Sequence, residues 1–144
     1  MASTVDDRIA AEVDRLIREH GTRDPFELAD KLGLVTRWTK LPAGYLGTVW
    51  ELWGVKVILL AIDTVIQEAR YIVAHEIFHH LDEHPEFWWV KKTFFGNYFE
   101  VLADRFAAEL LIQETPYGGE TEYEFAARLG VPIRLIRLWV KRVA

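Results

Sequence analysis

The chain has 144 residues, of which 51% are hydrophobic and 27% are charged, and this balance is typical of a globular protein with a buried core. It excludes an intrinsically disordered chain, and the length favours a single domain. The net charge of −5 argues against general nucleic-acid binding, which depends on basic surfaces, and the absence of cysteine excludes disulfides.

We expect a cytoplasmic protein that does not enter a membrane. Asp6, Asp7 and Arg8 stand where a signal peptide would have its apolar core. The longest apolar stretch, residues 55–62, contains Lys56 and is far too short to span a bilayer. The lack of cysteine also fits a reducing compartment.

Residues 1–34 predict two helices. Apolar side chains recur at helical spacing between positions 9 and 17, and Gly21 ends this first helix. Asp24 followed by Pro25 predicts the start of a second, short helix, because Asp caps a helix and Pro suits its first position.

Residues 35–62 predict a small sheet. Residues 35–39 form one expected strand, and the segments 45–52 and 55–62 are rich in β-branched and aromatic residues. Trp53-Gly54 between those segments predicts the turn of a hairpin.

The glycines that flank Tyr45 have two interpretations. Glycines allow another backbone to approach closely, so Gly44 and Tyr45 could begin an exposed edge strand that pairs with an extended substrate. Equally, Gly44 and Gly47 could only shape a loop.

The HExxH motif at residues 75–79 is the most informative feature of the chain. The surrounding residues predict a mostly buried helix that begins near Asp63-Thr64. His75 and His79 are four residues apart, so they lie one turn apart on one helix face and can hold a single metal ion. Glu76 stands beside that ion, where its carboxylate can reach a water molecule.

The alternative is an ordinary helix with a polar face and surface histidines. We favour the metal because this helix is apolar at Ile72, Val73, Ile77 and Leu81. A buried helix should not carry two histidines and a glutamate without partners, since unpaired polar groups are costly inside a protein.

A second helix, expected over residues 97–113, supplies a third metal ligand. Glu100 and Asp104 share one face of it, and small residues at 103, 107 and 108 would let the two helices approach closely. We assign Glu100 as the third ligand and Asp104 as the acceptor of a histidine N–H. The alternative for Glu100 is a solvated glutamate at a helix start. Glu109 and Asp82 are weaker candidate ligands.

His80 and His84 form another pair four residues apart, close to Pro85. Histidines near a helix C-terminus interact well with the helix dipole, and we favour this interpretation. A second metal site is the alternative, but it lacks an obvious carboxylate.

The C-terminal segment, residues 121–142, predicts a helix, a turn and a helix similar to a DNA-binding helix-turn-helix. It is basic, which favours contact with DNA. Two helices lack a core of their own, however, so we expect them to pack on the rest of the domain. Docking on a partner protein is a third option.

These elements predict an α+β fold, mainly helical, with a small three-stranded sheet packed beside the HExxH helix. One metallopeptidase domain would cover residues 1–144. Its parts are the N-terminal helices (1–34), the sheet with the metal-binding helices (35–116) and a C-terminal helical pair (117–144).

Two blocks of the sequence resemble the ImmA/IrrE family of small metallopeptidases. The first is Arg-Tyr-Ile-Val-Ala-His-Glu-Ile-Phe-His at residues 70–79. The second is Glu-Val-Leu-Ala-Asp-Arg-Phe-Ala-Ala-Glu-Leu-Leu at residues 100–111, and it is much less generic than HExxH. HExxH followed by ExxxD on a later helix is also similar to the gluzincin arrangement.

The resemblance implies that His75, His79 and Glu100 bind zinc and that Glu76 is the general base. It implies a cytoplasmic endopeptidase that cleaves a helix-turn-helix repressor, in a prophage, a mobile element or a stress response. Other members of the family pair with such regulators in modules similar to toxin–antitoxin systems. Two positions depart from the family pattern: Phe78 replaces a usual Gly, and Ile112-Gln113 replaces Met-Pro.

The expected function is therefore that of a zinc-dependent endopeptidase, with manganese as the alternative cation. Peptide hydrolysis also needs a donor that stabilises the oxyanion. The candidates are Tyr45, Tyr71, Tyr98 and His80, of which Tyr45 and Tyr98 could also contact the substrate. The rival hypothesis is a non-catalytic module in which the metal is structural and the protein binds a regulator or DNA.

Overall fold

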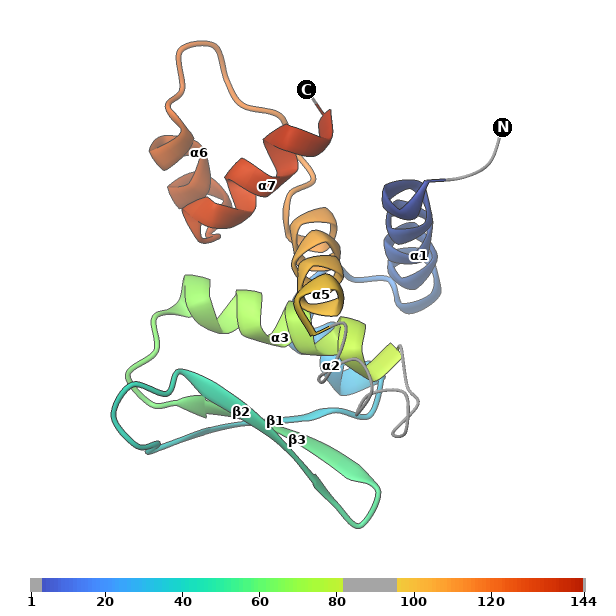
Figure 1. The fold of residues 1–144 in the computed structure, drawn as a ribbon, viewed down its shortest axis with the longest axis vertical. Helices are drawn as coiled ribbons and strands as arrows, with labels where there is room; N and C mark the ends of the chain where they lie inside the picture. Colours follow the sequence, from blue (N-terminus) through green and yellow to red (C-terminus); the bar gives the residue numbers. More distant parts are fainter. Residues whose placement is uncertain (1–3, 82–95, 144) are drawn as a thin grey trace.

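The computed structural model describes residues 4–81 and 96–143, in which helices predominate beside a three-stranded sheet (Figure 1). The helices are α1 (Val5–His20), α2 (Pro25–Lys31), α3 (Ile66–Leu81), α5 (Gly96–Leu111), α6 (Glu122–Leu129) and α7 (Ile133–Val143). The strands are β1 (Val35–Thr39), β2 (Gly47–Leu52) and β3 (Val55–Ala61). This is the mainly helical α+β fold predicted from the sequence.

The two N-terminal helices begin and end with the caps that the sequence predicts. Asp24 accepts hydrogen bonds from the first backbone N–H groups of α2 at 2.8 and 3.2 Å, and Pro25 opens the helix. Gly21 ends α1 in the left-handed conformation with φ 71°. The ends of α1 and α2 are therefore set by local contacts.

The sheet has the strand order β1-β3-β2, with β1 parallel and β2 antiparallel to β3. Trp53 and Gly54 form the predicted hairpin turn with φ values of 50° and 82°. Gly44 and Tyr45 lie in the connection before β2, which favours the loop interpretation for these two residues, and only Gly47 enters the strand. No other strand of the described chain pairs with the outer edge of β2.

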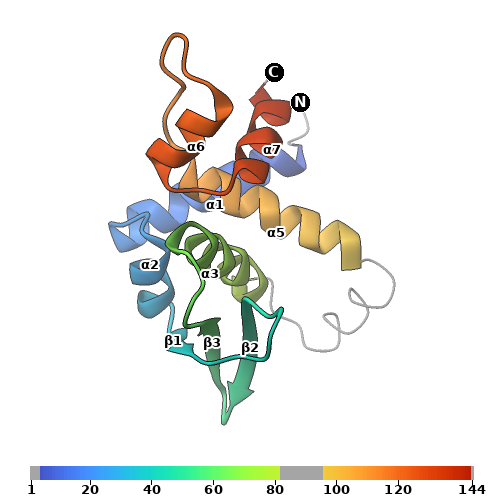
Figure 2. The same ribbon diagram turned by 90° about the vertical axis from the view of Figure 1, so that its left-hand side faces the viewer.

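Helix α3 lies between the sheet and helices α5, α6 and α7 (Figures 1 and 2). It contacts β2 and β3 on one side, α2 along its length and α5 on the opposite side. It begins at Ile66, two residues after the predicted start at Thr64, whose hydroxyl donates to the Leu46 carbonyl at 3.2 Å. A helix covered on several sides is apolar around most of its circumference, as the sequence of α3 indicates.

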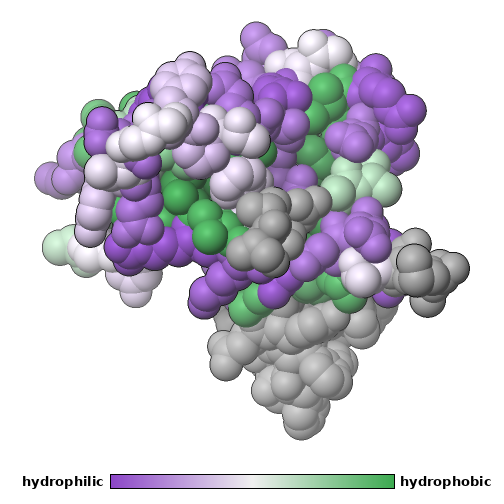
Figure 3. All heavy atoms as spheres, turned by 90° about the horizontal axis from the view of Figure 1, so that it is seen from above, coloured by the Kyte–Doolittle hydropathy of each residue, from purple (hydrophilic) through white to green (hydrophobic). Residues whose placement is uncertain are grey.

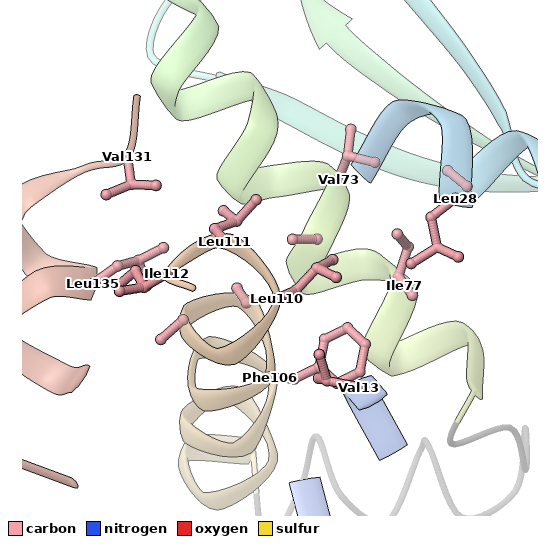
Figure 4. Packing of buried hydrophobic residues seen from close by; sticks show 14 of the residues in the cluster. Val13, Leu28, Val73, Ile77, Phe106, Leu110, Leu111, Ile112, Val131 and Leu135 are labelled. Atoms are coloured by element: carbon pink, nitrogen blue, oxygen red, sulfur yellow. The ribbon is translucent and has the colours of Figure 1, made fainter. Parts of the chain in front are cut away.

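One hydrophobic core joins the central helices. Phe106 of α5 packs toward Ile77 of α3 and Val13 of α1, whereas Ile112 after α5 meets Leu135 of α7 (Figure 4). These side chains are almost completely buried. The core therefore reaches from the N-terminal helices to the C-terminal pair and supports the expectation of one domain.

The C-terminal pair docks on α3 through a partly buried arginine. The Arg70 guanidinium donates to the carbonyl oxygens of Leu129 and Gly130 at 2.7 and 2.8 Å. These carbonyls lie at the end of α6, where backbone acceptors have no partner inside the helix. Gly130 ends α6 with φ 66°.

The helical end of the molecule, seen from above, is covered mainly by hydrophilic side chains with hydrophobic ones exposed between them (Figure 3). Within the part of the chain that the structure describes, no helix combines the length and the apolar character needed to cross a bilayer.

Replacing Gly130 by alanine should destabilise the fold. The new Cβ would lie 2.6 Å from an Arg70 nitrogen, and φ of +66° is unfavourable for an L-residue. The guanidinium would have to move and weaken its hydrogen bonds, so we expect a loss of about 1–3 kcal/mol in the free energy of unfolding. Gly118→Ala is the matched control because nothing lies within 4 Å of its added Cβ. Equal unfolding midpoints in urea for the two variants would contradict this account.

Candidate metal centre

His75 and His79 of α3 and Glu100 of α5 meet at one point between the two helices. The Nε2 atoms of His75 and His79 lie 3.1 Å apart. One Glu100 carboxylate oxygen lies 2.9 Å from His75 Nε2, and the other lies 2.9 Å from His79 Nε2. The three residues predicted as ligands thus form one group that could hold a metal ion.

Small side chains allow this convergence. Ala103 and Ala107 on α5 and Ala74 on α3 have no exposed surface. Without larger side chains between the helices, the short carboxylate arm of Glu100 reaches the two imidazoles. The histidine side chains are only 10% and 8% exposed, whereas that of Glu100 is 51% exposed. The group is therefore buried on the α3 side and open to solvent beside Glu100.

Asp104 fixes the orientation of His75. Its Oδ1 atom accepts from His75 Nδ1 at 2.8 Å, on the side of the ring away from Glu100. The Tyr71 hydroxyl donates to the same oxygen at 2.5 Å. The outer-shell position predicted for Asp104 is where the structure places it, and its partner is His75.

The His75 ring lies between two carboxylates, which determines its charge. Burial alone would lower the pKa of His75, but the hydrogen bonds to Asp104 and Glu100 raise it to about 9. The hydrogen bonds from His75 and then His79 hold the pKa of Glu100 well below its usual range. Without a metal, the ring is thus an imidazolium that donates to both carboxylates.

A divalent cation fits the same group. Zinc holds nitrogen and oxygen ligands at about 2.0–2.1 Å, so ligand atoms around it stand roughly 3.3 Å apart. The measured separations of 2.9 and 3.1 Å are close to that spacing. Once His75 has lost its Nε2 proton, both imidazoles and the carboxylate direct lone pairs at one position, where a cation would replace the proton.

Glu76 lies in the electrostatic field of this group. Burial raises the pKa of Glu76, an effect that the charges of His75 and His79 partly offset and that of Glu100 reinforces. Lys56 of β3 also acts on it, lowering its pKa. The carboxylate of the HExxH motif is therefore close enough to sense all three candidate ligands.

The remaining candidates from the sequence fare differently. Glu109 does not join the metal-binding group, and the Tyr71 hydroxyl is directed to Asp104, which argues against a role in stabilising an oxyanion. Tyr98 belongs to α5, but its side chain is outside the described part of the structure. Asp82 and His84 lie entirely outside the described residues. The proposed pair of His80 and His84 therefore stays a prediction.

Phe78 and Ile112 both have packing roles. Phe78 contacts the His79 ring edge-on, with centroids 5.8 Å apart, and packs against Phe106 at the same separation. Ile112 is 3% exposed and belongs to the core. The large side chain at position 78 thus supports one imidazole of the site.

Three arginines of the C-terminal pair are engaged in ion pairs within the protein. Arg128 pairs with Glu114 and Glu120, Arg134 with Glu68, and Arg137 with Glu122. The pair packs on α5 through α7, as we expected for two helices without their own core. These ion pairs reduce the positive charge that DNA contact through residues 121–142 would require.

Two features of the site are absent from the predictions made from the sequence. Tyr71 shares the Asp104 carboxylate with His75, and the Arg134 guanidinium covers the Tyr71 ring at 4.3 Å from its centroid. The signal for Tyr71 was present, because it stands four residues before His75 and so one turn away on the same face. Nothing local indicates that Arg134 reaches this ring.

No model of a known protein family matches this chain. A search of curated proteins also finds no match. The function is therefore inferred from the residues of the site and their geometry.

The stability of the metal-free protein should fall as the pH rises from neutrality. The His75 pKa of about 9 is above the 6.5 of an unperturbed histidine, so its contribution is complete below about pH 6.5 and is lost as the pH rises through 9. We expect the midpoint of thermal unfolding, measured by calorimetry in the presence of a chelator, to decline between pH 7 and 9.5.

Metal binding at pH 7 should release about one proton per ion. Binding heats that do not depend on the buffer's ionisation enthalpy would contradict this.

Replacing Glu100 by glutamine should weaken metal binding more than about 100-fold, since loss of an outer-shell partner alone typically costs 10–100-fold. Competition with a chromophoric chelator measures this affinity. Glu122→Gln is the control, because Glu122 is similarly exposed at 43% and pairs with Arg137 far along the chain. An unchanged affinity in Glu100→Gln would remove Glu100 from the ligand set.

Proposed function

We propose that this protein is a zinc-dependent endopeptidase. The observation that carries the proposal is the meeting of two imidazoles and a carboxylate beside Glu76, with one side open to solvent. Catalytic zinc sites have three protein ligands and an open position, whereas structural sites are closed by four. Within the described part of the chain, His75, His79 and Glu100 are a group of three that could hold a metal ion, which supports this interpretation.

Each residue of the site would have a distinct role. His75, His79 and Glu100 would hold the cation, and Asp104 would keep His75 in the tautomer whose Nε2 lone pair faces it. When bound, zinc supplies Lewis acidity that polarises a peptide carbonyl and makes a nearby water more acidic. Manganese is the alternative cation, since the ligand set is not exclusive to zinc.

Glu76 would act as the general base. Its carboxylate would take a proton from the attacking water and later deliver it to the amine that leaves. Burial raises its pKa toward neutrality, which suits a group that must accept and return a proton. Glu76 as a residue is not completely buried.

The free edge of β2 supports a peptide as substrate. An extended chain can add to an exposed edge strand through main-chain hydrogen bonds. β2 is such an edge, and it contacts α3, where the backbone of Gly47 approaches the side chain of Ile72. A substrate held there would run beside the helix that carries His75 and Glu76.

The substrate class is the less direct part of the proposal. The resemblance of residues 70–79 and 100–111 to ImmA/IrrE peptidases favours a helix-turn-helix repressor, in a cytoplasmic setting. Mixing the zinc-loaded protein with the repressor encoded beside its gene, and mapping fragments by mass spectrometry, tests this. An intact repressor in a preparation that cleaves other peptides would reject the substrate and keep the activity.

The rival function is a non-catalytic module that binds a regulator. Phe78, which fills space against the His79 ring, is the observation that favours it. A fourth protein ligand would also favour it, whereas exchangeable water in the coordination sphere would favour the enzyme. X-ray absorption of the zinc-loaded protein separates these two arrangements.

Replacing Glu76 by glutamine should leave zinc bound and reduce peptide cleavage by about 10²–10⁴-fold, the usual contribution of a general base. The measurement is hydrolysis of a mixed peptide library, with zinc content determined in the same preparation. Glu19→Gln on the surface of α1 is the control and should cleave normally, because Glu19 only pairs with Arg15. Cleavage at the normal rate by Glu76→Gln would refute this assignment.

A further inference from the structure

The Asp104 carboxylate serves two donors with a single oxygen. Tyr71 donates to Oδ1 at 2.5 Å and His75 Nδ1 lies 2.8 Å from the same atom. The two donors are themselves 3.5 Å apart. A carboxylate held by one donor can rotate about its terminal bond, whereas one held by two donors at one oxygen keeps that oxygen directed at both.

The Tyr71 side chain lies next to that of His75 along α3. It is one turn before His75, and the two rings lie 5.6 Å apart at 56°. Burial and then the hydrogen bond to Asp104 raise the pKa of Tyr71 above its usual range, so the phenol stays a donor. The hydroxyl thus donates to Asp104 and lies 3.5 Å from His75 Nδ1, the ring nitrogen that does not face Glu100, so its short contact with His75 runs through Asp104.

The guanidinium of Arg134 from α7 covers the Tyr71 ring. The guanidinium lies 4.3 Å from the ring centroid, a distance typical of cation–π contact. Two hydrogen bonds of 3.0 and 2.8 Å join the same guanidinium to both carboxylate oxygens of Glu68. Such a bidentate pair fixes the plane of the arginine, and Glu68 stands one turn before Tyr71 on α3.

These contacts form a continuous series from the C-terminal pair to the metal centre. Arg134 of α7 holds Tyr71, Tyr71 holds Asp104, and Asp104 holds His75. Each contact joins residues from different helices or different turns. No other arginine of α7 whose side chain is described reaches this series, since Arg137 pairs with Glu122 on the far side of the pair.

We propose that Tyr71 is a positioning residue for the metal centre and that the Arg134–Glu68 pair holds it in place, so that docking of the C-terminal pair sets the metal affinity of His75. This inference rests on metal binding by His75, His79 and Glu100, and it does not require peptidase activity. Partners of this outer kind orient the ligand and tune its basicity.

The affinity for Zn²⁺ tests the proposal directly. Tyr71→Phe keeps the ring and its contact with Arg134 but removes the hydroxyl, and we expect about tenfold weaker binding. Arg134→Met and Glu68→Gln each break the pair that holds the ring. Because they act one contact further out, we expect a smaller loss of about three- to tenfold in each.

The chain supplies a matched control. Arg137→Met removes an arginine from the same helix, of similar exposure at 53% against 50% for Arg134, that is also paired with a glutamate. Its zinc affinity should equal that of the wild type. The double variant Tyr71→Phe/Arg134→Met should bind zinc as Tyr71→Phe does, because Arg134 has no hydroxyl left to position.

A spectroscopic readout separates positioning from general destabilisation. In the metal-free protein, the imidazole ¹⁵N resonances of His75 should shift in Tyr71→Phe and Arg134→Met and stay unchanged in Arg137→Met. Thermal midpoints of all variants show whether each is folded. Should Tyr71→Phe fail to fold, the partly exposed Arg134→Met and Glu68→Gln still decide the question.

Two results would overturn the inference alone: affinities within twofold of the wild type in Tyr71→Phe and Arg134→Met, or an equal loss in Arg137→Met. A wild-type protein that binds no Zn²⁺ would overturn both this inference and the proposed function. Weaker zinc binding in the two variants, with normal binding in Arg137→Met, supports it.

Discussion

Two carboxylates from α5, one on each side of the His75 ring, are the interaction on which the candidate site depends. Glu100 faces Nε2 at 2.9 Å and Asp104 faces Nδ1 at 2.8 Å. An imidazole between two carboxylates is stabilised in its protonated form, which raises the pKa of His75. The arrangement therefore favours a positive charge at the meeting of α3 and α5, which either the imidazolium or a bound metal ion could supply.

Close packing of α3 and α5 offsets the free-energy cost of burying these polar groups. Polar groups lose hydration when they are buried, so two imidazoles and a glutamate beside a core need partners at hydrogen-bond distance. Ala74, Ala103 and Ala107 bring the helices close enough for those partners to meet, and Phe106 with Ile77 seals the core next to them. On the side of Glu100, whose side chain is 51% exposed, the group remains open to solvent.

The C-terminal pair contributes to the centre although its residues lie far along the sequence. Arg70 joins α3 to the end of α6, and Arg134 of α7 returns to α3 at Glu68 and Tyr71. Arg128, Arg134 and Arg137 are engaged in ion pairs within the protein, which reduces the positive charge that this pair could present to DNA. We propose that this pair helps to hold the candidate metal ligand His75 in position.

The sequence by itself determined the local elements and the chemistry of the motif helix. Caps, glycines and apolar spacing are local signals, so α1, α2, the hairpin at Trp53-Gly54 and both central helices were predictable within a few residues. The i, i+4 spacing of the histidines fixed their shared face. Only the tertiary structure decided which oxygen of Glu100 faces which histidine nitrogen. It also decided that Asp104 contacts His75 and not His79, and that Arg134 covers the Tyr71 ring. These contacts join residues 25–63 positions apart, and no local pattern encodes how separate helices meet.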